Sequence, residues 1–310
     1  MDYGHPLEFG YFLTPDAADP VGVLATARFL DARGYDLIGV QDHPYQPRHL
    51  DTMSLLAATL AQTSSVRVFA AVGNLPLRSP AVLAKAAATL DLLSGGRFEL
   101  GIGAGGYLGP AHAMGAPALT PRKSLEALEE GVAVIRAMWS GERGGLRFDG
   151  DHYQLAGVHP GPMPAHPIQV WIGANMPHAL ALTGRVADGW VSPLMNYKPP
   201  REAAQGNVAI DHAAREAGRD PREIRRIFLI PGAFASTSQA PATDTDQSIV
   251  GPADHWVEVL THFALDLGFG TFVLVAPPDL DTLTTFIEDV APTVRERVGE
   301  RRATQEGPDA

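Results

Sequence analysis

Residues 66–105 read VRVFAAVGNLPLRSPAVLAKAAATLDLLSGGRFELGIGAG and contain two apolar runs separated by a helical pattern. The runs 66–74 and 97–105 are apolar at nearly every position, which is typical of parallel strands buried on both faces. Between them, Ser79-Pro80 indicates a helix start, because serine caps helix N-termini and proline fits the first helical turn. Gly95-Gly96 indicates the end of that helix. The segment therefore predicts a β–α–β unit of a parallel sheet.

The same unit recurs along the whole chain. Four such units alone fit either a doubly wound sheet or a barrel. Eight strand candidates alternating with helices in 310 residues favour a TIM (β/α)8 barrel. The predicted strands begin near residues 8, 35, 66, 97, 168, 189, 227 and 271, and the predicted helices begin at Pro20, after Asp51, and at Pro80, Pro121, Pro177, about residue 200, Pro252 and Leu280.

Two insertions interrupt the regular alternation. Residues 106–119, rich in Gly, Ala and Pro, predict an irregular insertion after strand 4, and residues 235–250 predict a mobile one after strand 7. Residues 141–167 are typical of loop and hairpin structure. No linker divides the chain, so we expect a single domain over residues 1–300, followed by a flexible C-terminal tail at 301–310.

Composition excludes several classes of function. The chain has 24 Lys+Arg and 35 Asp+Glu, a net charge of −11, which argues against nucleic-acid and anionic-membrane partners. It has no cysteine, so disulfides, thiolate metal sites and cysteine nucleophiles are excluded. No apolar run approaches the ~20 residues of a membrane span, and the N-terminus lacks a secretory signal. We therefore expect a cytoplasmic protein without a membrane anchor.

The candidate site lies at the C-terminal ends of the predicted strands, where TIM barrels hold their active sites. Asp42 and His43 follow the second strand; an imidazole titrates near neutrality and suits proton transfer, and Asp42 is placed to orient it or tune its charge. The alternative is a loop histidine without a role. Ser192 follows the sixth strand.

Small residues end the third, fourth and fifth strands, which allows a flat ligand to approach the backbone. The fifth strand ends in Gly-Ala-Asn just before a helix with Pro177 near its start, and exposed N–H groups at that terminus suit a phosphate. The alternative is that these glycines serve only tight turns.

Other motifs are weak or absent. Gly101, Gly103 and Gly106 match the G-x-G-x-x-G spacing, but a dinucleotide site needs this motif to open a helix in the first β–α–β unit. The chain has no H-E-x-x-H and no G-x-S-x-G, which disfavours a metal-dependent hydrolase and a serine hydrolase. We therefore expect no metal site.

Four segments carry a resemblance to a known family. They are GYDLIGVQDHPY (34–45), NLPLRSPAVLAKAAATLDLLSGGRFELGIGAG (74–105), PIQVWIGANMPHALALTGRVADGW (167–190) and IVGPADHWVEVL (249–260). The chain resembles the bacterial luciferase-like oxidoreductases, TIM barrels that use FMN or the deazaflavin coenzyme F420. The resemblance implies a tricyclic ring across the barrel mouth, with His43 near its reactive part; the Asp42-His43 pair is common in deazaflavin-dependent members.

The resemblance also implies which residues surround the cofactor. In the family, a segment after strand 3, often with a strained and sometimes cis peptide bond, supports the ring. The stretch after strand 4 borders the cofactor. The stretch between strand 5 and the helix that follows it helps to hold the phosphate. In this chain those three positions are occupied by Gly73, Asn74 and Leu75; by Gly103, Ala104 and Gly105; and by Gly173, Ala174, Asn175 and Met176.

The chain departs from the family at one position. Luciferase has a phosphate-binding arginine just after strand 4, where this chain has Ala104, Gly105 and Gly106. Arg185 or Arg78 is a candidate substitute. The resemblance also implies that residues 235–250 close over the site, and that a homodimer forms through helices near strands 2 and 3.

Three hypotheses on function follow. The first is a luciferase-like monooxygenase that uses reduced FMN and O2 on a small organic substrate, with His43 moving a proton. The alternative is an F420-dependent dehydrogenase or reductase that transfers a hydride. The third is a non-catalytic flavin-binding barrel.

Overall fold

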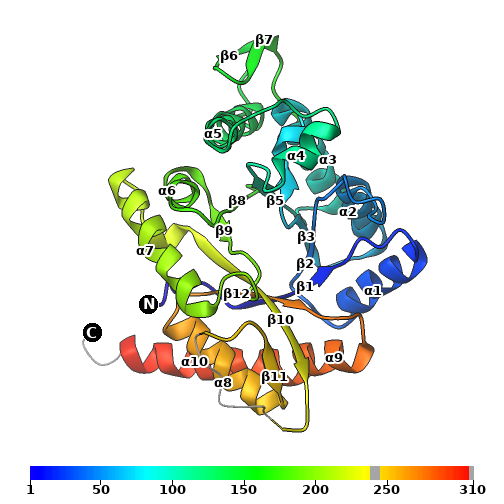
Figure 1. The fold of residues 1–310 in the computed structure, drawn as a ribbon, viewed down its shortest axis with the longest axis vertical. Helices are drawn as coiled ribbons and strands as arrows, with labels where there is room; N and C mark the ends of the chain where they lie inside the picture. The colour runs from blue at the N-terminus through cyan, green and yellow to red at the C-terminus, as the bar shows by residue number, and fades with distance from the viewer. Residues whose placement is uncertain (238–244, 307–310) are drawn as a thin grey trace.

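The computed structural model describes residues 1–237 and 245–306 and shows a closed parallel barrel (Figure 1). Strand β10 pairs with both β12 and β9, and these pairings close the sheet. The predicted TIM barrel is therefore confirmed. Its strands are β1 (Glu8–Leu13), β2 (Leu37–Val40), β3 (Arg67–Ala70), β5 (Phe98–Gly103), β8 (Val170–Gly173), β9 (Gly189–Val191), β10 (Arg225–Phe234) and β12 (Thr271–Val275); the short β4 (Gly73–Asn74) extends β3 beside β5.

The helices begin where the capping residues predicted. The Asp19 and Asp51 carboxylates accept hydrogen bonds from the backbone N–H groups of Gly22 and Ser54, whereas Ser79 makes no side-chain cap. The main helices are α1 (Pro20–Ala32), α2 (Thr52–Gln62), α3 (Pro80–Ser94), α5 (Pro121–Met138), α6 (Pro177–Val186), α7 (Pro200–Glu216), α8 (Ala253–Leu265), α9 (Leu280–Thr284) and α10 (Ala291–Glu306), with a π-helical segment, η3 (Thr285–Val290), between the last two. No helix of the described residues is long and apolar enough to cross a membrane.

The insertions differ in part from expectation. The hairpin β6 (Leu146–Asp149) and β7 (Gln154–Val158) forms within 141–167, beside α5 at the top of Figure 1. The segment 106–119 is not wholly irregular: α4 (Leu108–Ala113) forms there because Ala111 packs fully buried. Strand β11 (Ile249–Gly251) pairs with β10, while residues 238–244 of the expected mobile insertion lie outside the described residues.

The C-terminal tail is shorter than expected. Residues 301–306 continue helix α10, and the Arg302 guanidinium donates to the Asp2 carboxylate and to the His5 carbonyl. This pairing with the N-terminal segment orders the last helical turns, a long-range contact that the local sequence pattern does not reveal. The N-terminus and the end of α10 lie on the same side of the molecule (Figure 1). Residues 307–310 lie outside the described part.

Charged side chains close the N-terminal end of the barrel. Arg67 pairs with Glu8 and, at 3.0 Å, with Glu99, and Arg225 lies 3.1 Å from Glu8. Buried charges are tolerated when they are paired in this way. Above them, the barrel interior is filled by an apolar cluster that includes Phe69 and Trp171, packed edge to face at 5.0 Å. The C-terminal end is therefore the end left open for a ligand.

His166 adds a pH-dependent contribution to this closed end. Its Nδ1 lies 2.7 Å from Asp91 and its Nε2 3.4 Å from Glu99, and these carboxylates, Glu99 foremost, raise the pKa of His166 above 6.5. Because the pKa of His166 is higher in the folded than in the unfolded protein, the pairing contributes its full stabilisation below pH 6.5. This contribution is lost as the pH rises through the pKa of the folded protein. We expect His166→Gln to lower the free energy of unfolding by roughly 1–2 kcal/mol at mildly acidic pH, and by clearly less at alkaline pH.

Urea titrations of both proteins across this pH range measure the effect. The exposed pair of His212 with Glu216 supplies the control, and His212→Gln is expected to change stability little at any pH. A His166→Gln loss that is the same at acidic and alkaline pH would contradict the charged pairing.

Candidate functional site

A cavity of about 1130 Å³ opens at the C-terminal ends of the barrel strands. Its floor and walls come from the residues that end β2, β3, β5, β8 and β9, together with α4, α5 and the start of α6. The volume is large enough for a tricyclic cofactor together with a small substrate, since ligand pockets commonly measure ~300–1,000 Å³. The predicted site residues that line it are Asp42, His43, Gly73, Asn74, Gly103, Ala104, Gly105, Gly173, Ala174, Asn175 and Met176.

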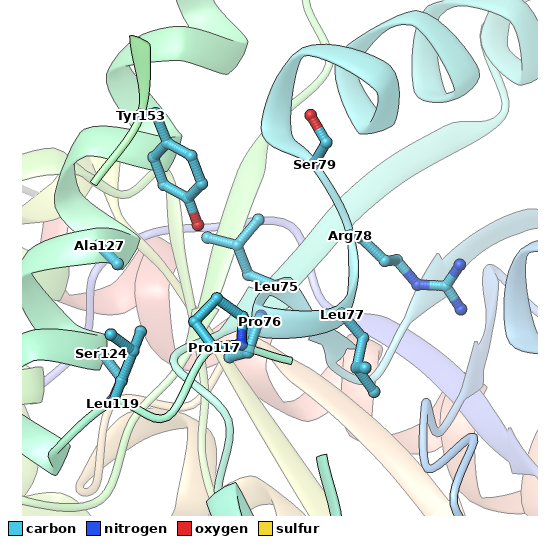
Figure 2. A pocket seen from close by; sticks show the side chains of 10 residues that line it. All are labelled: Leu75, Pro76, Leu77, Arg78, Ser79, Pro117, Leu119, Ser124, Ala127 and Tyr153. Carbon is cyan, nitrogen blue, oxygen red and sulfur yellow. The ribbon is translucent and has the colours of Figure 1, made fainter. Parts of the chain in front are cut away.

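Leu75 is the predicted cofactor residue that the structure places elsewhere. It is only 2 % exposed and points into a separate cavity of about 180 Å³, toward Tyr153 (Figure 2). The side chain of Arg78 extends away from that small cavity (Figure 2). Leu75 thus packs behind the wall of the large cavity, where it supports Asn74 without facing a ligand.

The Asp42 carboxylate binds partners other than His43. Its carboxylate is buried and accepts two hydrogen bonds from the Arg78 guanidinium, at 2.8 and 2.9 Å, and one from the Asn74 backbone N–H at 2.8 Å. Arg78 also reaches Asp51 at 2.9 Å. Asp42 makes no hydrogen bond with His43, so it fixes the end of β2 against the segment that carries Asn74. The imidazole is not oriented by it.

His43 faces the cavity within an aromatic group. Its ring stacks on Tyr45 at 5.4 Å and meets Tyr107 edge-on at 5.5 Å. Among the described residues, neither ring nitrogen has a hydrogen-bond partner. Burial, with a smaller effect from His49, lowers the pKa of His43 below its usual value, although Asp42 opposes the shift. The neutral imidazole therefore predominates at neutral pH and is available as a base.

Tyr45 and Tyr107 flank His43 and cover one side of the cavity. Burial raises the pKa of Tyr45 to about 12, so its hydroxyl stays protonated at neutral pH. Tyr107 lies in the insertion after strand 4 and is 56 % exposed at the cavity edge. Nothing in the sequence indicated Tyr107, because its place beside His43 depends on how the insertion after strand 4 folds back.

The backbone around β3 leaves room for a ligand. A non-proline cis peptide bond lies between Ala71 and Val72, just before the segment Gly73–Leu75 for which the resemblance implied a strained peptide. Val72 packs closely on two glycines: a Cβ on Gly103 would meet it at 3.0 Å, and one on Gly173 at 2.6 Å. The small residues at the ends of β5 and β8 therefore accommodate Val72 as well as a ligand.

Anion-binding groups lie at the α5 and α6 side of the cavity. Helix α6 begins at Pro177 without a side-chain cap, and Met176 and His178 at its start line the cavity, so its first N–H groups lack a capping side chain near the cavity. Arg185 lines the cavity and pairs with Glu129 at 3.0 Å, and Arg122 pairs with Glu126 at 2.8 Å. Of the two arginines proposed as substitutes, Arg185 is therefore placed for a phosphate.

Two buried polar atoms in the cavity wall have no partner. The Asn74 Oδ1 and the Ser192 Oγ make no hydrogen bond, although Asn74 is 5 % and Ser192 1 % exposed. A buried polar atom without a partner costs about 1–3 kcal/mol, and both of these residues belong to the cavity lining. Within the described residues, no three His, Asp or Glu side chains gather to hold a metal ion.

Comparison with known proteins identifies the family. The model of the luciferase-like monooxygenases matches residues 7–274. The chain belongs to this family. Family membership agrees with the closed barrel and with the small residues at its mouth, as the resemblance in the sequence implied.

Individual relatives add detail. An F420-dependent glucose-6-phosphate dehydrogenase of Kineococcus radiotolerans is 33 % identical over 61 % of this chain and 57 % of its own length. A protein of the same name in Nakamurella multipartita is 31 % identical over 77 % of this chain and 71 % of its own. This chain thus spans less than two thirds of the first relative. A solved F420-dependent secondary alcohol dehydrogenase superposes with a TM-score of 0.80 over 94 % of this chain and 99 % of its own, at 19 % identity, which shows the shared fold.

Proposed function

We propose that the protein is an F420-dependent oxidoreductase that transfers a hydride between the cofactor and a small organic substrate. The observation that carries the proposal is the set of relatives named F420-dependent dehydrogenases, at 33 % and 31 % identity. They favour the hydride-transfer alternative over the FMN monooxygenase that we first expected. A neutral His43 in the cavity supports the same conclusion, because a dehydrogenase needs a base for the hydroxyl proton.

The residues present fit such a cofactor. Asn74 Oδ1 is an unpaired acceptor for a ring N–H, and Gly103 and Ala104 let a flat ring lie on the backbone. The N–H groups at the start of α6 suit the phosphodiester of F420, and Arg185, in the last turn of the same helix, also lines the cavity. When bound, F420 supplies a centre that accepts or releases a hydride, a two-electron step.

The protein's own contribution is placement, shielding and proton transfer. His43 takes the hydroxyl proton as an alcohol is oxidised and returns it in the reverse direction. The Tyr45 and Tyr107 rings pack against the imidazole and against each other. Asp42 and Arg78 fix Asn74, so the cofactor and His43 keep one relative position.

The activity is expected to depend on pH through His43. Its pKa lies below 6.5, so the neutral base persists to mildly acidic pH. The kcat/KM for alcohol oxidation is expected to be flat near neutrality and to fall as the pH drops through that lowered pKa; carbonyl reduction, which needs the protonated ring, is expected to fall as the pH rises. Initial rates in both directions test this, and an acid limb for oxidation centred above 7 would contradict it.

Titration with each cofactor tests the proposal. We expect the visible absorbance and fluorescence of F420 to change saturably with one site per chain, and FMN to bind at least about tenfold more weakly, a difference of ~1.4 kcal/mol. Turnover with F420 is expected to continue without O2. Tighter binding of FMN, or turnover that requires O2, would overturn the proposal and favour the monooxygenase.

A further inference from the structure

The stretch between β8 and α6 is held by two side chains that do not themselves line the cavity. The Trp190 indole N–H donates to the Ala174 carbonyl at 2.9 Å, and the Lys198 ammonium donates to the Asn175 carbonyl at 3.0 Å. Trp190 is a fully buried residue of β9, and Lys198 lies in the loop between β9 and α7. Two successive carbonyl groups of the stretch are therefore engaged by residues on or just after β9.

These two contacts determine where the neighbouring N–H groups point. In a trans peptide, the C=O of one residue and the N–H of the next point in opposite directions. The Asn175 N–H is thus directed away from the Trp190 indole, and the Met176 N–H is directed away from the Lys198 ammonium. Neither N–H donates a hydrogen bond to any residue that the structure describes, and both residues line the cavity. The stretch therefore offers two consecutive unpaired donors just before α6.

Lys198 also fixes the side chain of Asn175. Its ammonium donates to the Asn175 Oδ1 at 3.0 Å, so the amide oxygen faces the lysine and the amide NH2 group is turned away from it. The lysine is held in turn, because its own backbone N–H donates to the Leu194 carbonyl at 3.1 Å. An amide NH2 group donates hydrogen bonds, whereas the amide oxygen only accepts them. The orientation that Lys198 imposes therefore suits an anionic acceptor.

Lys198 is partly withdrawn from solvent. Burial lowers the pKa of its ammonium, although Glu202 opposes the shift. A charged group that gives up water needs fixed hydrogen-bond partners in exchange, and the two Asn175 oxygens supply them. Because Lys198 does not line the cavity, its contacts act on Asn175 and not on a ligand directly.

We propose that Lys198 is a positioning residue for the phosphodiester of the cofactor. By binding both Asn175 oxygens, it presents the Asn175 and Met176 N–H groups, together with the Asn175 amide, to the phosphate. This inference rests on the proposed function and deepens it, because it assigns the arrangement of the anion-binding groups to a residue outside the cavity.

Two forms of the cofactor, with and without the phosphodiester, test this role. Fluorescence titrations measure the Kd of F420 and of its deazaflavin core, whose ribityl chain ends in a hydroxyl. We expect Lys198→Met to weaken F420 binding by about tenfold, equal to ~1.4 kcal/mol, and to leave the Kd of the core within about twofold. Lys85→Met is the matched control, because it removes an exposed lysine of α3, and it is expected to keep both Kd values.

A double-mutant cycle with Asn175→Ala distinguishes orientation of Asn175 from direct contact with the phosphate. If Lys198 acts through Asn175, Lys198→Met weakens F420 binding by only about threefold or less when Asn175→Ala is already present. A tenfold loss in both backgrounds would overturn the positioning role. Unchanged F420 binding by Lys198→Met, or an equal loss for F420 and for the core, would also overturn it. Failure of the unchanged protein to bind F420 is a separate result, which would overturn the proposed function and this inference with it.

Discussion

His43→Ala is expected to lower turnover by roughly 10²- to 10⁴-fold while the affinity for F420 stays within about threefold. The structure explains both parts of this result. The imidazole faces the cavity and is held by ring contacts with Tyr45 and Tyr107, so its loss removes the proton acceptor. Asn74 and the start of α6, which are placed to hold the cofactor, make no hydrogen bond with the imidazole.

Steady-state kinetics and a fluorescence titration of the same His43→Ala preparation measure the two quantities. Added imidazole is expected to restore part of the lost turnover, which a purely structural role would not allow. His212→Ala, at an exposed position on α7, is the control and is expected to keep full turnover. If His43→Ala retained its turnover, the protein would fit a non-catalytic binder or a reaction without this base.

Asp42→Ala is expected to act on the fold and on cofactor binding together. The change removes one of the two carboxylates that Arg78 binds and leaves the Asn74 N–H without its acceptor, because both groups donate to the buried Asp42 carboxylate. Breaking a buried ion pair from one side costs about 3–5 kcal/mol; Arg78 keeps Asp51 and is partly exposed, so we expect roughly 3 kcal/mol. Because Asn74 shifts with it, F420 affinity is expected to fall by roughly tenfold, or ~1.4 kcal/mol.

Denaturant unfolding and an F420 titration check this prediction. The control is Asp51→Asn, which removes the other charge beside Arg78 but leaves an oxygen to cap α2. It is expected to cost less than about 1 kcal/mol, as exposed pairs do. An Asp42→Ala protein with unchanged stability and F420 affinity but a displaced pH profile of activity would contradict this prediction. Such a result would indicate that Asp42 acts directly on His43.

The barrel could be predicted from sequence because its signals are local. Each strand is a short apolar run, and helices such as α1 and α5 start at a proline behind a capping residue, at Asp19-Pro20 and Thr120-Pro121. The predictions that failed concerned elements that depend on contacts between residues far apart in the sequence. Helix α4 forms because Ala111 becomes buried, and the end of α10 is ordered by Arg302 contacting Asp2, some 300 positions earlier in the chain.

In the candidate site, too, some features could be predicted from the sequence and others could not. The topology predicted which strand ends meet, so Asn74, Gly103, Ala174 and their neighbours line one cavity. The partner of Asp42 was not predictable, because its adjacency to His43 in sequence suggested a pair, whereas its carboxylate turns to Arg78, 36 positions away. Leu75 likewise follows the cavity residues in sequence but packs behind them, since the short helix after β4 turns it inward.

Transfer of a deuterium label distinguishes hydride transfer to F420 from oxygenation with FMN. A secondary alcohol deuterated at its carbinol carbon is incubated with the protein and oxidised F420 without O2, and the products are analysed by mass spectrometry. We expect one deuterium in the reduced cofactor for each carbonyl compound formed. Reduced cofactor without deuterium, or a product that forms only with FMN and O2, would contradict it.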